Sequence, residues 1–125
     1  MSTTPHVQYR HFRLYGGSLR DLKPLTKGGM TMAFVSPKQL DDLTENDTVK
    51  LAFAFCSKDD VYCRAAGRSL SAMRLLDGQT ITVPGDQFRI RFYQDAIPDI
   101  LKAFRRFCLT KSTHDELTGA IKRFS

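Results

Sequence analysis

Apolar and polar residues alternate most regularly in the segment TVKLAFAF, residues 48–55. Every second residue is large and apolar, and a period of two is typical of a β-strand with a buried face. The other side carries Lys50, Ala52 and Ala54, which are mostly small enough to pack closely against a helix. We expect this strand to lie centrally in a sheet. The side chains expected on its core face are those of Val49, Leu51, Phe53 and Phe55.

Other segments predict further strands. Residues 7–15 mix aromatic and basic residues, and residues 30–35 form a short apolar run after a turn at Gly28 and Gly29. Residues 38–48 are polar and acidic, which indicates a loop or a short helical turn. The segments TITV and FRIRFY, joined by PGDQ, predict a hairpin in which Phe88, Ile90 and Phe92 share a side.

Three segments predict helices from their caps and apolar spacing. The first runs from about residue 59 to 76, with Ser57 and Asp60 as a capping box. The second begins at Asp95 and carries apolar residues at helical spacing as far as Cys108. The third is opened by a capping box of Thr113 with Glu116. The apolar stripes of the second and third helices are Ile97, Ile100, Leu101, Phe104, Phe107 and Cys108, and Leu117, Ile121 and Phe124.

This order of elements predicts an α+β fold. We expect a single domain over residues 7–125, with a largely antiparallel sheet of about five strands packed against two to three helices. Residues 1–6 are expected to form a flexible N-terminal tail. A chain of 125 residues is long enough for one hydrophobic core.

The formal net charge of +6 favours an anionic partner, either nucleic acid, a nucleotide or an acidic surface. Solubility alone is the alternative explanation. The chain starts without the apolar run of a signal peptide, and no stretch resembles a membrane span, so we expect a cytoplasmic protein without membrane contact. Cys56, Cys63 and Cys108 are odd in number and lack CxxC spacing, which predicts reduced thiols.

The helix over residues 59–76 separates into two faces. Arg64 and Arg68 lie one turn apart, with Gly67 and Ser71 beside them and Arg74 at the edge. Two guanidinium groups next to small residues suit a phosphate, and the alternative is that both are solvated surface charges. The opposite side is expected to face the sheet; its residues are Tyr62, Ala66, Ser69, Met73 and Leu76.

Two further basic clusters are Arg89 with Arg91, and Lys102 with Arg105 and Arg106. Aromatic residues such as Tyr93 accompany them, and a base can stack on such a ring. The three clusters form an anion site if they converge in space, or across a subunit boundary, and are surface charge if they do not. The candidate phosphate- or nucleotide-binding residues are Tyr62, Arg64, Arg68, Arg74, Arg89, Arg91, Lys102, Arg105 and Arg106.

The sequence gives little support for catalysis or for a metal site. His6, His11 and His114 are scattered, have no metal-ligand spacing, and are expected to be solvated. Cys63 lies near a helix start beside Arg64, but no general base accompanies it. The acidic residues between 41 and 47 lack the spacing of a calcium loop. We therefore expect a protein that is not an enzyme and that holds neither metal nor cofactor.

The segment CSKDDVYCRAAGRSLSAMRLL, residues 56–76, resembles a pattern of small bacteriophage-encoded accessory proteins. In that pattern an acidic, an aromatic and a basic residue, then Gly-Arg and a final Arg-Leu, follow a strand. It is similar to the Thoeris anti-defence 1 type, whose members sequester cyclic nucleotide immune signals. The motif covers less than a fifth of the chain, and Ser71 stands where Ala is expected. The matching residues are Asp60, Tyr62, Arg64, Gly67, Arg68, Arg74 and Leu75.

The expected function is therefore that of a phage-type protein which recognises phosphate-bearing nucleotides in the host cytoplasm, and which sequesters a cyclic nucleotide signal of host defence. A pocket for a small ligand would favour a homo-oligomer. Two alternatives stay open. One is a basic DNA- or RNA-binding protein, and the other is an inhibitor that binds a host enzyme through an apolar surface.

Overall fold

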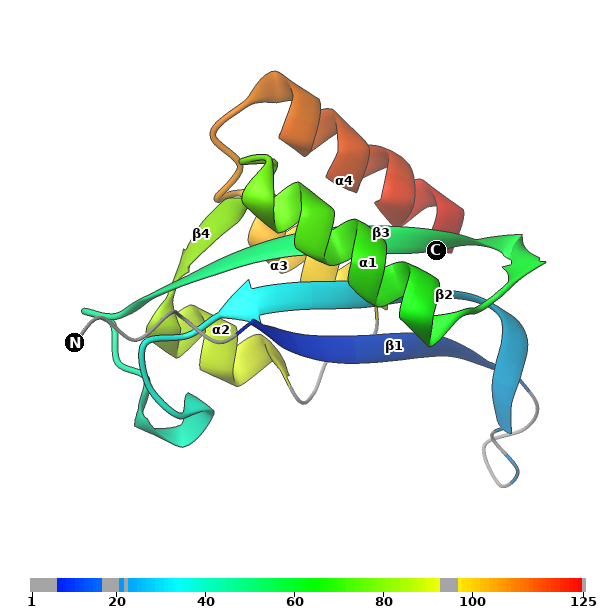
Figure 1. Cartoon of the computed structure of the whole chain (residues 1–125), viewed down its shortest axis with the longest axis horizontal. Helices are drawn as coiled ribbons and strands as arrows, with labels where there is room; N and C mark the ends of the chain where they lie inside the picture. The colour runs from blue at the N-terminus through cyan, green and yellow to red at the C-terminus, as the bar shows by residue number, and fades with distance from the viewer. Residues whose placement is uncertain (1–6, 17–20, 22, 93–96, 125) are drawn as a thin grey trace.

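The strands follow one another across a single antiparallel sheet in the order β1-β2-β3-β4 (Figure 1). The computed structural model describes residues 7–16, 21, 23–92 and 97–124. The expectations for residues 1–6, for Tyr93 and for Asp95 as a helix cap therefore lie outside the described residues. The strands are β1 (Gln8–Gly16), β2 (Lys23–Val35), β3 (Thr48–Val61) and β4 (Ile81–Pro84).

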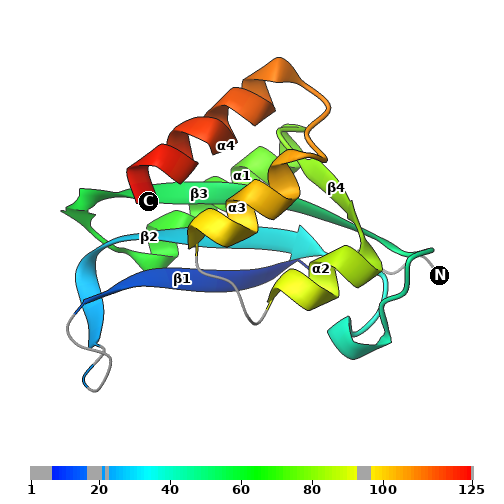
Figure 2. The same cartoon turned by 180° about the vertical axis from the view of Figure 1, so that it is seen from behind.

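The helices form layers on the two faces of this sheet. One helix, α1, lies on one face, and α2 and α3 lie on the other, where α4 packs against α3 (Figures 1 and 2). The α+β class and the single domain are confirmed, with four strands and four α-helices among the described residues rather than about five strands and two to three helices. The helices are α1 (Arg64–Leu76), α2 (Gly85–Phe92), α3 (Ile97–Arg105), α4 (Lys111–Phe124) and the 3-10 turn η1 (Leu40–Asp42).

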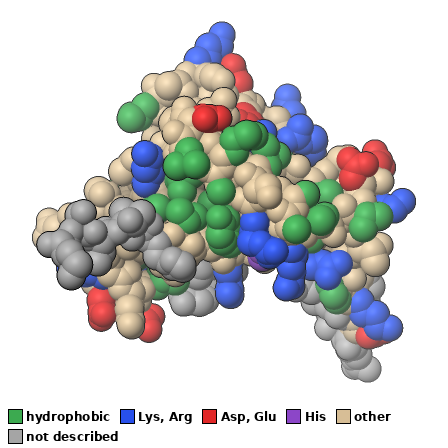
Figure 3. Space-filling model, viewed as in Figure 1, with side chains coloured by type: hydrophobic (Ala, Val, Ile, Leu, Met, Phe, Trp, Pro, Cys, Tyr) green, Lys and Arg blue, Asp and Glu red, His purple; other side chains and the backbone are tan. Residues whose placement is uncertain are grey.

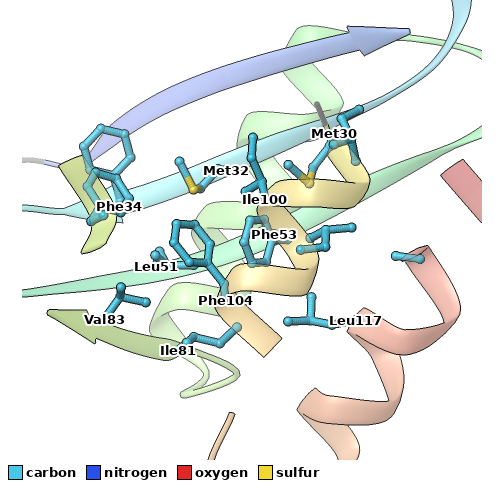
Figure 4. Packing of buried hydrophobic residues seen from close by; sticks show 14 of the residues in the cluster. Met30, Met32, Phe34, Leu51, Phe53, Ile81, Val83, Ile100, Phe104 and Leu117 are labelled. Carbon is cyan, nitrogen blue, oxygen red and sulfur yellow. The ribbon is translucent and has the colours of Figure 1, made fainter. Parts of the chain in front are cut away.

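The hydrophobic core lies between the sheet and the layer of α2 and α3 (Figure 4). Alternate residues of β2 and β3 enter it, as the period of two predicts. The ring of Phe104 on α3 stacks against Phe53 and Phe88, with centroids 6.4 and 6.1 Å away. β3 is central, as predicted, because it pairs with both β2 and β4. Its other face carries Ala52, which is buried beneath Leu75 of α1.

The prediction of a second hairpin strand at residues 88–93 was wrong. Residues 85–92 form α2, which directly follows the short strand β4. Asp86 lies in the first turn, where a carboxylate interacts favourably with the helix dipole. Phe88 is fully buried against Phe34. The alternation of apolar and basic residues resembled a strand because a helix of two turns gives too few residues to distinguish the two periods.

The predicted turn at Gly28 and Gly29 is instead a bulge within a longer strand. β2 begins at Lys23, and its register with β1 and β3 shifts around Gly28. The φ angle of Gly28 is +78°, a conformation that residues with a Cβ rarely adopt. A Cβ at Gly29 would lie 2.9 Å from the Cδ2 atom of Tyr62, so the bulge also makes room for that ring.

Two predicted helix starts also change. β3 continues to Val61 and α1 begins at Arg64, so Ser57 and Asp60 lie in the strand and not at a helix cap. Ser57 accepts a hydrogen bond from the backbone of Asp59 instead. α4 begins before Thr113, whose backbone N–H donates to the Oγ1 atom of Thr110. Within the described residues, no helix is long and apolar enough to cross a membrane.

Candidate functional site

Helix α1 packs on the sheet through the side opposite to the predicted one. Ser71 and Leu75 are buried, whereas Met73 and Leu76 are 52% and 86% exposed. The reason is the shape of the sheet face, whose small and β-branched residues let the helix backbone come close. A Cβ at Gly67 would lie 2.1 Å from the Oγ1 atom of Thr31, so this contact depends on glycine.

Beneath the first turn of α1, three polar side chains join β1, β2 and the end of β3. The Nδ1 atom of His11 lies 2.8 Å from the hydroxyl of Tyr62 and 3.0 Å from that of Thr31. The two hydroxyls are 2.7 Å apart, and that of Tyr62 donates to the backbone carbonyl of Met30. His11 is thus half-buried and hydrogen-bonded, and the expectation of a solvated histidine was wrong for this residue.

Three arginines surround this network, and we call Arg13, Arg64 and Arg68 the arginine cluster. Arg13 lies two residues after His11 on β1, and therefore on the same face of the strand. Its guanidinium donates to the carbonyl of Leu25 and lies 6.0 Å from the centroid of the Tyr62 ring. Figure 3 shows Lys and Arg side chains gathered beside a histidine on this face, near the first turn of α1.

Burial and the neighbouring arginines shift the pKa values of His11 and Tyr62. Burial lowers the pKa of His11 below its ordinary value, and the positive charges of Arg64 and Arg68 lower it further. Burial raises the pKa of Tyr62, while Arg64 and Arg13 act in the opposite direction. His11 is therefore neutral near pH 7, and the positive charge of the site comes from guanidinium groups.

Among the described residues, no carboxylate forms an ion pair with the arginine cluster. The first turn of α1 contains no acidic residue. Placing positive side chains at a helix N-terminus is unfavourable on electrostatic grounds. An anion between the arginines would offset that repulsion and accept several charged hydrogen bonds.

Arg74 does not belong to this cluster. Its guanidinium donates to the carbonyl of Phe53, 2.8 Å away, and to the carboxylate of Glu116 on α4, 2.6 Å away. β4 pairs with β3 only along residues 48–51, so the Phe53 carbonyl lies beyond that pairing. Arg74 satisfies this carbonyl and joins α1 to α4, which is a structural role.

The remaining basic candidates lie in the opposite layer. Arg89 on α2 donates to the backbone of Asp41, and Lys102 is exposed on α3. Arg105 donates to Thr118 on α4, and Arg106 donates to Gln87. The backbone of Arg91 lies in α2, and its side chain is outside the described residues. The structure therefore brings together Tyr62, Arg64 and Arg68, and it separates Arg89, Lys102, Arg105 and Arg106 from them.

The structure adds His11, Arg13 and Thr31 to the site. Their signal was present in the sequence as spacing, because His11 and Arg13 alternate with apolar residues on a predicted strand. The sequence did not indicate which face of the sheet α1 covers, and therefore did not place these residues beside Arg64 and Arg68.

Other chemistry finds little support in the described residues. Cys56, Cys63 and Cys108 are all unpaired, as predicted. No group of three or more His, Cys, Asp or Glu side chains in the described residues is placed to hold a metal ion. Asp47 of the acidic loop accepts hydrogen bonds from Thr44 and pairs with Lys38, which accounts for its lowered pKa. Comparisons with protein families, curated proteins and solved structures found no match.

Proposed function

We propose that the protein binds a phosphate-bearing nucleotide at the arginine cluster and acts by sequestration rather than by catalysis. The observation that carries this proposal is the position of Arg64 and Arg68 beside a neutral His11, with Arg13 beside the Tyr62 ring and no carboxylate paired to Arg64 or Arg68 among the described residues. Guanidinium groups bind phosphate oxygens in pairs of hydrogen bonds, and each charged hydrogen bond contributes about 1.5–3 kcal/mol.

The resemblance to the Thoeris anti-defence 1 type of phage protein agrees with this proposal. Of its matching residues, Tyr62, Arg64, Gly67 and Arg68 form or border the arginine cluster. The ligand would then be a nucleotide signal of host defence, bound in the cytoplasm. A homo-oligomer stays a prediction, and native mass spectrometry of the purified protein tests it together with any retained nucleotide.

Nucleic-acid binding is the main alternative, and the salt dependence of affinity distinguishes it. Three arginine contacts to single-stranded DNA predict a slope of roughly −2 for log affinity against log salt concentration. A small nucleotide releases few counterions, and its affinity is expected to fall much less.

The test is calorimetric titration of the protein with a cyclic nucleotide, with AMP and with short single-stranded DNA, each at low and high salt. The proposal predicts binding of a nucleotide with a shallow slope. Strong binding of DNA alone with a steep slope would favour the nucleic-acid alternative. Absence of binding to all three probes would contradict both.

The alternative of a protein inhibitor draws on a different observation. Met73 and Leu76 of α1 are exposed, and Figure 3 shows apolar side chains grouped along this helix. In that case native mass spectrometry would find a stoichiometric host enzyme and no nucleotide.

A further inference from the structure

A surface pocket of about 190 Å³ lies between the end of β3 and the first half of α1. Most of its wall is apolar or small, and its polar groups come chiefly from the end of β3. Side chains that line it include those of Ala54, Phe55, Val61, Tyr62, Ala66 and Leu70. None of the residues that line this pocket belongs to the arginine cluster.

The pocket and the arginine cluster both border the Tyr62 ring, although no arginine among the described residues lines the pocket. Tyr62 lines the pocket, and the guanidinium of Arg13 lies 6.0 Å from the centroid of the same ring. Gly67 also lines the pocket, and it lies against Thr31 of the hydrogen-bonded network. Ala66 lies on the other side of α1 from Arg64 and Arg68, so a ligand must extend from the pocket around the first turn of the helix to approach these arginines.

The size of the pocket sets what it can hold. Cavities of about 150 Å³ accept a benzene ring, whereas pockets that enclose a drug-sized ligand measure about 300–1,000 Å³. A pocket of about 190 Å³ thus takes one aromatic ring system, and the rest of the ligand must lie outside it.

The charges around the pocket indicate which end of such a ligand lies inside it and which end lies outside. Asp60 lines the pocket, and its carboxylate would repel a phosphate placed there. The guanidinium groups of Arg64 and Arg68 attract a phosphate that lies outside the pocket. The hydroxyl of Tyr62 is held by His11, Thr31 and the Met30 carbonyl, so the ring is a fixed wall that loses little entropy on binding.

We propose that this pocket binds the base of a nucleotide whose phosphate lies on the arginine cluster. The inference rests on the proposed function and deepens it, because it assigns the ligand a neutral aromatic ring beside its phosphate. It requires a nucleotide to bind more tightly than the same sugar phosphate without a base.

Calorimetric titration with AMP and with ribose 5-phosphate tests this directly. We expect AMP to bind the wild-type protein roughly tenfold or more tightly, since stacking on an aromatic ring contributes to each base bound. Ala66→Leu fills the pocket from an exposed position of α1, and Ala65→Leu makes the same change at a neighbouring exposed position that does not line it. Both substitutions keep a strong helix former, so both variants should fold.

The inference predicts that Ala66→Leu lowers the affinity for AMP to that for ribose 5-phosphate and leaves ribose 5-phosphate unaffected, while Ala65→Leu alters neither. Equal affinity of the wild-type protein for AMP and ribose 5-phosphate would overturn the inference and leave the proposed function standing. The inference would also be overturned if Ala66→Leu and Ala65→Leu changed the affinity for AMP equally. If neither compound binds the wild-type protein, the inference fails, and the titration with a cyclic nucleotide then decides whether the proposed function stands.

Discussion

Gly67 determines how closely α1 approaches the sheet. The substitution Gly67→Ala would place a Cβ atom 2.1 Å from the Thr31 hydroxyl oxygen, so helix or strand must move. We expect a loss of about 1–3 kcal/mol in the free energy of unfolding, although alanine favours a helix. Gly119→Ala in α4 is the matched control, because no atom of the described residues outside its own stretch of helix lies within 4 Å of its Cβ position. It should stabilise the protein by about 0.4–1 kcal/mol.

Urea unfolding of the two variants measures both effects. If Gly67→Ala stabilised the protein as much as Gly119→Ala, the close contact between α1 and β2 would not exist in solution.

His11 links stability to pH. Its pKa in the folded protein lies below the ordinary value of 6.5, so below that pH the unfolded chain binds a proton more readily than the folded one. The free energy of unfolding should therefore fall as pH decreases from about 7 through the pKa of the folded state, and His11→Gln should show a weaker fall. Urea unfolding at several pH values between about 5 and 7.5 measures this, and parallel curves would contradict the burial of His11.

At the scale of elements, Arg74 joins α1 to β3 and α4. Arg74→Ala would leave the carbonyl of Phe53 without its side-chain donor and Glu116 without its partner. Because both charged side chains are partly exposed, we expect a loss of about 1.5–3 kcal/mol. Glu116→Gln keeps an acceptor for Arg74 and should cost less than about 1 kcal/mol. Thermal or urea unfolding checks both values.

Nucleotide titration of Arg74→Ala separates this role from ligand binding. An affinity as low as that of a variant lacking Arg64 and Arg68 would show that Arg74 belongs to the binding site after all.

β3 is the element on which both layers depend. Phe53 is 5% exposed and contacts the rings of Phe55 and Phe104, so Phe53→Ala should destabilise the protein by about 3–5 kcal/mol. Leu109→Ala is the control, because Leu109 is 91% exposed and its truncation should change stability by less than about 0.5 kcal/mol. A loss below about 1 kcal/mol for Phe53→Ala would place β3 at the edge of the sheet.

At the scale of the whole molecule, long periodic segments made the fold predictable. The alternation along residues 48–55 and the helical stripe of Ile97, Ile100, Leu101 and Phe104 correspond to buried faces in the structure. Short segments were ambiguous, since the eight residues of α2 satisfy a strand pattern as well. Helix starts were missed where an apparent capping box, such as that of Ser57 and Asp60, lay in a strand.

The candidate site was predictable only in part, because it is assembled from three distant segments. Arg64 and Arg68 were found as neighbours on one helix, where spacing alone brings them together. Whether Arg64 and Arg68 lie close to His11 and Arg13 depends on which side of α1 faces the sheet. Small residues decided that side, because Gly67 and Ser71 permit close packing that the larger Met73 does not.

The central claim is that the arginine cluster binds phosphate, and the most direct test removes equal charge from two places. Arg64→Gln/Arg68→Gln alters the cluster, and Arg89→Gln/Lys102→Gln alters the opposite layer by the same two charges. We expect calorimetric titration with AMP to show a loss of about 1.5–3 kcal/mol for each charged hydrogen bond removed in the first variant. The second should bind as the wild type does, since solvent and salt screen distant charges. Equal losses in both variants, or none in either, would contradict a phosphate site at this cluster.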